Sequence, residues 1–149
     1  MEGQLAREAN KRIENVSKGV DGTKLEALAV EGLRVVHAQK GLLRCRFLIS
    51  NAVSDQRGNW YVGAITTLMD DLAAFATYSS TGLVNATVSL NISYYSTAKI
   101  QEEVDIEAKV VAEMGKLTSV VVEVKRTDNG KLIALGRQWM TSIKNQSGQ

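Results

Sequence analysis

Asp70 and Asp71 are the only formally charged side chains between Gly58 and Ala98. A carboxylate removed from water without a partner costs on the order of several kcal/mol. An acid that persists in such an uncharged stretch is therefore a candidate for binding or catalysis. The alternative is a pair of acids that cap a helix or form an ion pair with a neighbouring subunit.

The residues needed for most other catalytic schemes are missing. His37 is the only histidine and Cys45 the only cysteine, which excludes a zinc site of clustered histidines and cysteines and an intrachain disulfide. Both lie in predicted strands, where a packed or surface histidine and an inert core thiol are the simpler interpretations. The motifs Gly-x-Ser-x-Gly and Gly-x-Gly-x-x-Gly and the phosphate-binding loop are absent. We therefore expect no metal and no cofactor.

The two aspartates fall within a predicted helix over 62–79. Large apolar residues recur there at the spacing of one helix face, at Ile65, Leu68, Met69, Leu72 and Phe75. Asp70 falls on the opposite face, among the small residues Thr66, Ala73, Ala74 and Thr77. We expect a helix about 27 Å long that is wrapped on most sides. Its small face would let another backbone or a ligand approach closely.

The remaining segments predict one more helix and a sheet. The spacing of apolar residues predicts a short amphipathic helix over 5–16, and 33–38 and 42–50 are typical of a hairpin. After a loop over 51–61 and the long helix, strands are expected over 86–96, 104–111, 117–126 and 131–142. Alternation in 86–96 places Leu90 and Tyr94 on one face and Thr87 and Ser89 on the other. A long helix with one large antiparallel sheet is an α+β two-layer domain.

The chain has 149 residues, 18 of them basic and 16 acidic, so its formal net charge is +2. This length suits one domain, expected over 30–144, between an N-terminal helical extension (1–29) and a tail (145–149). The small charge does not suggest a nucleic-acid binder. Because no apolar run approaches the roughly 18 residues of a membrane span and no signal peptide is evident, we expect no membrane insertion and a cytoplasmic location, with an organelle left open.

Three segments resemble the hot-dog fold acyl-CoA thioesterases. Residues 58–71 are similar to the start of that family's central helix, where a His-Gly-Gly motif precedes an aspartate. Here Gly63 stands at the last glycine of the motif and Asp70 at the aspartate. Residues 90–99 resemble the family's Asn-Ile-x-Tyr-x-Ser-Pro-Ala-Lys strand, and 130–137 resemble its last strand. The likeness covers residues 30–142 and is strongest to the acyl-CoA thioesterase 13 and phenylacetyl-CoA thioesterase-like group. It implies a hot-dog fold, in which one antiparallel sheet wraps a long central helix.

The resemblance also implies roles for individual residues. Asp70 would be the general base or nucleophile that acts on the thioester carbonyl. The backbone N–H groups of Val62 and Gly63 would hold the carbonyl oxygen, which suits the unpaired donors and positive dipole end of a helix N-terminus. Thr87 lies where the family often has a serine that positions the attacking water. Asp55 lies about where the family often has an asparagine that contacts the carbonyl or the water.

The same resemblance implies an acyl-CoA substrate and an oligomer. A fatty or aromatic acyl-CoA would be hydrolysed to the free acid and coenzyme A, so coenzyme A is part of the substrate and not a cofactor. A homodimer, assembling further to a homotetramer, would supply the base and the oxyanion donors from different subunits. The residues expected to contact the substrate are Tyr61, Ser89, Tyr94, Tyr95, Ser96, Lys99, Gly115, Lys116 and Arg137. Among these, the lysines and the arginine would bind phosphate.

Several positions depart from the family's pattern and leave a second function open. Tyr61 replaces the motif histidine, Val62 its first glycine and Thr97 the usual proline. Val62 retains an N–H, but its side chain narrows the approach of the thioester. These changes favour, as the alternative, a non-catalytic acyl-CoA or lipid-binding protein with the same fold. A hot-dog dehydratase is disfavoured, because its chemistry pairs a histidine with an acid and His37 lies outside the helix region.

Overall fold

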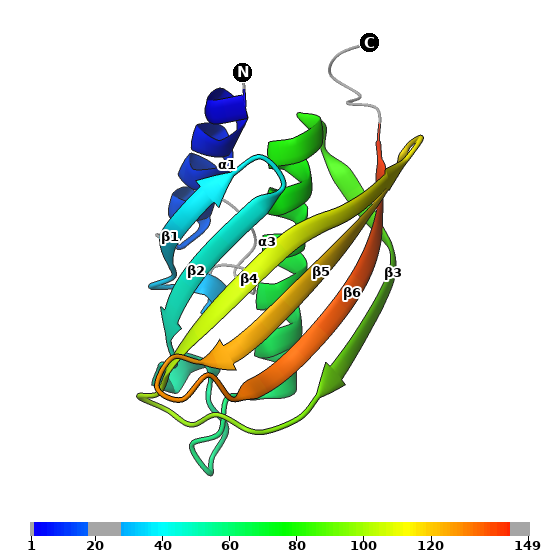
Figure 1. The fold of residues 1–149 in the computed structure, drawn as a ribbon. Helices are drawn as coiled ribbons and strands as arrows, with labels where there is room; N and C mark the ends of the chain where they lie inside the picture. The colour runs from blue at the N-terminus through cyan, green and yellow to red at the C-terminus, as the bar shows by residue number, and fades with distance from the viewer. Residues whose placement is uncertain (1, 18–27, 144–149) are drawn as a thin grey trace.

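The computed structural model describes residues 2–17 and 28–143 (Figure 1). Helix α1 (Glu2–Ser17) precedes the hairpin of β1 (Arg34–Gln39) and β2 (Leu42–Leu48), the 3₁₀ turn η1 (Asn51–Val53) and the long helix α3 (Val62–Thr81). The strands that follow are β3 (Asn85–Tyr94), β4 (Glu103–Met114), β5 (Leu117–Arg126) and β6 (Leu132–Ser142). The helices and strands predicted from the sequence are all present, and their ends differ from the prediction by a few residues at most.

The strands form one antiparallel sheet of six strands, in the order β1-β2-β4-β5-β6-β3. Figure 1 shows this sheet curving across α3, with β1 at one edge and β3 at the other. After α3 the chain enters the sheet at the edge opposite β1. There β3 pairs with β6 and not with β4, the next strand in sequence. The predicted α+β class, with a long helix wrapped by one antiparallel sheet, is confirmed.

Helix α3 supplies the centre of the hydrophobic core. Its side chains Leu68, Met69 and Leu72 are fully buried and belong to the same cluster as Phe47 of β2 and other inward residues of the sheet. The helix ends at Gly82, whose φ of 72° is left-handed and whose N–H donates to the Tyr78 carbonyl at 2.8 Å. Such a cap satisfies one of the carbonyls that a helix end leaves free.

Helix α1 packs against α3 and β1 and adds to this core. Ala6, Ala9 and Ile13 are buried, and Ile13 belongs to the main cluster. The Tyr78 hydroxyl of α3 donates to the Glu8 carboxylate at 2.9 Å. The predicted domain boundary between residues 29 and 30 stays a prediction, and the predicted tail over 145–149 lies outside the described residues.

A β-bulge in β3 corrects the predicted alternation of that strand. The register against β6 shifts between Thr87 and Ser89, which leaves Val88 as an extra residue with 58% of its surface exposed. Two residues of β3 then oppose one of β6, so the side chains on either side of the bulge no longer alternate strictly. As a result Thr87 faces α3, on the same side as Leu90, whereas strict alternation placed the two on opposite faces.

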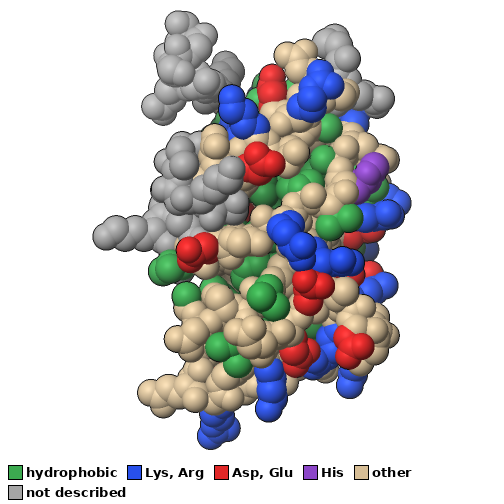
Figure 2. Space-filling model, turned by 90° about the vertical axis from the view of Figure 1, so that its left-hand side faces the viewer, with side chains coloured by type: hydrophobic (Ala, Val, Ile, Leu, Met, Phe, Trp, Pro, Cys, Tyr) green, Lys and Arg blue, Asp and Glu red, His purple; other side chains and the backbone are tan. Residues whose placement is uncertain are grey.

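The outer face of β1, β2 and β4 is charged. Cross-strand ion pairs join Arg34 to Glu103, Arg44 to Glu107 and Arg46 to Asp105, each at 2.8 Å. Figure 2 shows basic and acidic side chains interleaved toward the right of the view. Exposed pairs of this kind each contribute about 0–1 kcal/mol, so they add little to the stability of the fold. None of the described helices combines the length and hydropathy of a membrane-spanning segment.

Candidate active site

A polar cluster around Asp70 joins α3, β3 and β6. The Thr87 hydroxyl donates to Asp70 Oδ1 at 3.0 Å, and Nε2 of Gln138 donates to the same oxygen at 2.5 Å. Nε2 of Gln138 also donates to Thr87 Oγ1 at 2.8 Å. One oxygen of the carboxylate therefore accepts two hydrogen bonds from neutral groups, and this fixes the direction in which the carboxylate points.

Each member of the cluster is positioned by its own element. Asp70 lies half-buried on the small-residue face of α3, as its helical phase predicted. Thr87 reaches it because the bulge turns the Thr87 side chain toward the helix. Gln138 is an inward residue of β6 and is only 1% exposed. The cluster thus lies between α3 and the edge strand β3, where the sheet ends.

The orientation of the Gln138 amide follows from its neighbours. If the amide were turned over, its oxygen would face the Asp70 carboxylate, which can only accept hydrogen bonds when ionised. In the observed orientation Gln138 Oε1 is buried and has no hydrogen-bond donor among the described residues. An unpaired buried polar atom costs about 1–3 kcal/mol. The contact with Asp70 and Thr87 therefore determines how this side chain sits.

A second contact between α3 and β3 lies one helical turn before Asp70. Thr66 Oγ1 donates to the Val62 carbonyl at 2.8 Å and lies 2.6 Å from the Tyr94 hydroxyl. Because Thr66 has a single hydroxyl hydrogen, the Tyr94 hydroxyl is the donor in the second bond. Tyr94 as a whole is 42% exposed. Hydroxyl contacts thus join α3 to β3 at two places, Tyr94 and Thr87.

The N-terminus of α3 presents free backbone donors. Its N-cap residue Tyr61 makes no side-chain capping bond, and the first turn holds no acidic residue. The first amides of a helix have no intrahelical acceptor and lie at the positive end of its dipole. Val62 is 55% exposed and Gly63 is also exposed. These two amides therefore match the donors that an oxyanion requires.

Within one chain, these amides and Asp70 are too far apart to serve one carbonyl group. Val62 and Gly63 precede Asp70 by two helical turns, which at the usual rise is about 10–12 Å along the axis. A base and an oxyanion donor must each lie about 3 Å from the reacting group. The structure therefore brings Asp70 and Thr87 together, but not these residues with Val62 and Gly63.

Asp55 is engaged within its own loop. Its Oδ1 accepts the backbone N–H groups of Arg57 and Asn59, both at 2.9 Å. The Trp60 N–H donates to the Ala98 carbonyl at 2.8 Å, which ties this loop to the segment after β3. Asp55 thus stabilises the turn that leads into α3, and the hydrogen bonds recorded for its side chain do not involve the Asp70 cluster.

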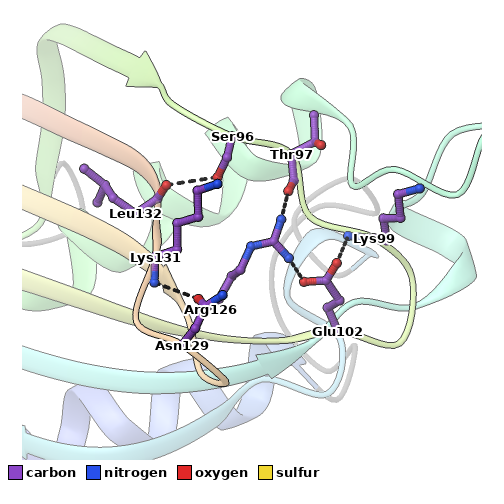
Figure 3. A network of polar contacts seen from close by, with 8 residues as sticks. All are labelled: Ser96, Thr97, Lys99, Glu102, Arg126, Asn129, Lys131 and Leu132. Atoms are coloured by element: carbon purple, nitrogen blue, oxygen red, sulfur yellow. Dashed lines mark hydrogen bonds and ion pairs between the residues drawn. The ribbon is translucent and has the colours of Figure 1, made fainter.

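Arg126 anchors the segment after β3, where coenzyme A contacts were predicted. Its guanidinium donates to the Thr97 carbonyl and to the Glu102 carboxylate, and Glu102 Oε1 accepts the Lys99 N–H at 3.1 Å (Figure 3). The Ser96 hydroxyl donates to the Leu132 carbonyl at 2.9 Å. The side chains of Tyr95 and Lys99 stay exposed. Sequence reasoning missed Arg126, although one of its partners, Thr97, lies in the predicted segment.

Four of the predicted substrate residues lie away from Asp70. Ser89 and Arg137 are on the outer face of the sheet, where they line a hollow of about 460 Å³ with Asn91 and Trp139. Gly115 and Lys116 form the turn between β4 and β5, and the Lys116 carbonyl accepts the Ser142 N–H. That turn lies beside the start of β3, whereas the segment 94–99 follows its end, so roughly 30 Å of strand separates the two within a chain.

Sequence reasoning also missed Gln138 and Thr66. Gln138 is a lone polar residue at an inward position of β6, between Gly136 and Met140, and that isolation was the available signal. Thr66 was identified only as a small residue of the Asp70 face. Neither contact with β3 can be derived from helix periodicity, because each joins segments that are distant in sequence.

The other reactive side chains do not form a site. Cys45 is 1% exposed, and burial raises the pKa of its thiol to about 12, in agreement with an inert core thiol. His37 is an exposed strand residue whose Nε2 lies 2.7 Å from Gln39 Oε1. Within residues 2–17 and 28–143, histidine, cysteine and acidic side chains do not gather in groups that could hold a metal ion.

Comparison with known proteins identifies the family. The thioesterase superfamily matches residues 57–133. Acyl-coenzyme A thioesterase 13 of Mus musculus is 30% identical over 109 residues, which make up 72% of this chain and 78% of that protein. The crystal structure of zebra fish thioesterase superfamily member 2 has a TM-score of 0.82 and 26% identity, covering 91% of this chain and 98% of that chain.

A more distant structure shares the fold alone. A hypothetical thioesterase protein from Streptococcus pneumoniae TIGR4, solved with coenzyme A, has a TM-score of 0.72 and 18% identity, covering 77% of this chain and 88% of that chain.

The superfamily match contains all of α3 and β3, and with them Asp70 and Thr87. The chain therefore belongs to the thioesterase superfamily, a family of thioester hydrolases, and has its hot-dog fold.

Proposed function

We propose that this protein hydrolyses fatty or aromatic acyl-CoA thioesters, with Asp70 as the general base. Asp70 takes a proton from a water molecule whose oxygen attacks the thioester carbonyl. The carbon–sulfur bond then breaks, and the proton passes to the leaving sulfur, which gives the free acid and coenzyme A. The reaction uses water and the chain's own residues, with no metal and no cofactor. The nucleophilic alternative, in which Asp70 attacks the carbonyl itself, uses the same carboxylate.

One observation supports this proposal above the others. The Asp70 carboxylate is held by Thr87 and Gln138 through a single oxygen, on the helix face that carries small residues. A carboxylate that is oriented but not neutralised by a cation is suited to accept a proton from water. Thr87, whose hydroxyl lies 3.0 Å from Asp70 Oδ1, is suited to orient that water.

We further propose that the active site is shared between two subunits. Pairing of two β3 edges in antiparallel fashion would place the start of one β3 beside the end of the other. The amides of Val62 and Gly63 in one subunit would then approach Asp70 of the other, and Lys116 would approach the partner segment that contains Lys99. The exposed edge of β3 favours such pairing. Assembly of two dimers into a homotetramer and a cytoplasmic location belong to the same proposal.

Coenzyme A is proposed to bind along the segment after β3. The phenol of Tyr94 and the exposed side chains of Tyr95 and Lys99 offer hydrogen-bonding and apolar surface next to the N-terminus of α3. Lys99 and Lys116 are suited to bind its phosphates. Arg137 on the outer face of the sheet would reach coenzyme A only from another subunit of an assembly.

The test is release of free thiol from short, medium, long and aryl acyl-CoAs. Asp70→Asn should lower kcat by about 100-fold or more, because the base is lost while the shape is kept. Asp71→Asn makes the same charge change at the next residue and serves as the matched control. Retained turnover in Asp70→Asn would refute the mechanism, and its loss in Asp71→Asn alone would move the role to Asp71.

The placement of Tyr61 favours one second candidate function, acyl-CoA binding without hydrolysis. The Tyr61 ring lies against Gly63, so that a Cβ at Gly63 would be 3.5 Å from it. This aromatic side chain occupies space beside the proposed oxyanion donors. Saturable acyl-CoA binding without thiol release by the wild-type protein would establish this function instead.

A further inference from the structure

We propose that Gln138 is a positioning residue that determines which oxygen of Asp70 meets the reacting water. This inference rests on the proposed thioesterase function. It concerns a residue of β6 that lies beyond the end of the superfamily match at residue 133.

The hydrogen bonds around Asp70 form a closed ring. One hydrogen of the Gln138 amide goes to Asp70 Oδ1 and the other to Thr87 Oγ1. The Thr87 hydroxyl then sends its own hydrogen to Asp70 Oδ1. Both amide hydrogens and the hydroxyl hydrogen are thereby used, and every bond in the ring has an unambiguous donor.

This ring distinguishes the two oxygens of the carboxylate. Oδ1 accepts both hydrogen bonds of the cluster, at 2.5 and 3.0 Å. The carboxylate cannot rotate about its last bond without breaking both of them. Oδ2 is therefore presented in one fixed direction and is the atom that would accept the proton of the water.

Gln138 also prevents Thr87 from turning away. Thr87 Oγ1 accepts a hydrogen from Nε2 of Gln138, which leaves its hydroxyl hydrogen directed toward Asp70. Without the amide, the hydroxyl could rotate and donate elsewhere. Gln138 thus orients both the base, Asp70, and the Thr87 hydroxyl that would position the water, each through its own hydrogen bond.

A purely structural role for Gln138 does not account for its surroundings. The residue is 1% exposed, and its Oε1 has no donor among the described residues. An apolar side chain of similar size at this inward position would leave no unpaired polar atom. The amide is explained by what its nitrogen does for Asp70 and Thr87.

The experiment compares Gln138→Leu and Gln138→Glu with the wild-type protein. Gln138→Leu keeps the volume and removes both donors, and Gln138→Glu places a second carboxylate against Asp70. Met140→Leu, at the next inward position of β6, is the control for a change in packing. Each protein is assayed for thiol release from the acyl-CoA that the wild type hydrolyses best, as a function of pH.

We expect Gln138→Leu to lower kcat by about 10–100-fold, with KM changed by no more than about 2-fold. In both Gln138 variants the acid limb of the pH profile should move to higher pH, because the charged carboxylate has lost a donor or gained a like charge. Met140→Leu should change neither kcat nor the acid limb of the pH profile. Equal effects of Met140→Leu and Gln138→Leu, or an unchanged pH profile in Gln138→Glu, would overturn the proposal.

A second measurement does not depend on turnover. The ¹³C resonance of the Asp70 carboxyl carbon, assigned by its loss in Asp70→Asn, is followed through a pH titration. In Gln138→Leu its midpoint should rise by about half a pH unit or more. An unchanged midpoint would overturn the role of Gln138 even in an active enzyme. Absence of thiol release by the wild type would instead refute the proposed function, and the titration would still decide the role of Gln138.

Discussion

At the scale of single residues, the partners of Asp70 are neutral groups. A threonine hydroxyl and a glutamine amide orient the carboxylate without bringing a second charge. An arginine in the same place would hold the carboxylate more tightly, but would oppose its taking up a proton. Neutral donors therefore fit a group that must alternate between charged and protonated forms during a reaction.

Cys45 allows a prediction about stability at alkaline pH. Its pKa in the folded protein is raised from 9.0 to about 12, so the unfolded chain loses the thiol proton first as the pH increases. The protonated thiol of the folded protein therefore contributes to the free energy of unfolding. This contribution is complete below pH 9 and is lost toward pH 12, by up to about 1.4 kcal/mol per pH unit.

The measurement is urea unfolding of the wild type and of Cys45→Ala across this pH range. The difference in unfolding free energy between the two proteins should shrink as the pH rises above 9. A constant difference would show that the thiol does not ionise on unfolding. At neutral pH the buried thiol should also stay unreactive toward thiol reagents, so it should add no background to thiol-release assays.

At the scale of secondary-structure elements, Gly136 of β6 lets the sheet approach α3 closely. A Cβ at Gly136 would lie 2.8 Å from Met69 Cε and 3.3 Å from Ile92 Cγ1. Met69 is fully buried, so its side chain has little room to move. Gly136→Ala should therefore lower the free energy of unfolding by about 1–3 kcal/mol.

Thermal or urea unfolding of Gly136→Ala would test this packing. Adding Met69→Leu, which shortens the side chain that meets the new methyl group, should recover part of the loss. If the double variant were no more stable than Gly136→Ala, the clash with Met69 would not be its cause.

The elements were predictable from the sequence because their signals are local. Helix periodicity identified α3 and placed Asp70 on its small face. The absence of other charges singled out Asp70 and Asp71 together, and the family resemblance chose Asp70. The bulge at Val88 is a matter of pairing with β6, which alternation within β3 does not contain, so the direction of Thr87 was wrong. The role of Gln138 could not be predicted because its contact with Asp70 joins residues that are 68 positions apart in the sequence.

At the scale of the whole molecule, the separation between Asp70 and the amides at the start of α3 leads to a complementation experiment. Val62→Pro removes one proposed oxyanion donor, and proline is well tolerated at the first helical position after an extended residue such as Tyr61. Asp70→Asn removes the base. Each variant alone should be almost inactive if a site takes one group from each subunit.

Mixing the two variants in equal amounts, by joint refolding, should restore activity. Random pairing in a two-fold dimer makes half of the dimers mixed, each with one intact site, so about a quarter of the wild-type activity is expected. Sites contained within single subunits would regain none. Sedimentation of the wild type should accordingly show a dimer or a larger assembly.

If the start of α3 holds the oxyanion as proposed, its lack of a side-chain cap sets helix stability against activity. Aspartate is a preferred N-cap, and Tyr61→Asp would stabilise the helix by about 1 kcal/mol by accepting the N–H groups of its first turn. The same carboxylate would occupy the position proposed for the oxyanion of the substrate. A chain that had lost its selective need for hydrolysis could therefore become more robust through one substitution. Tyr61 makes no such cap, so the first amides of α3 keep their donors for the proposed oxyanion.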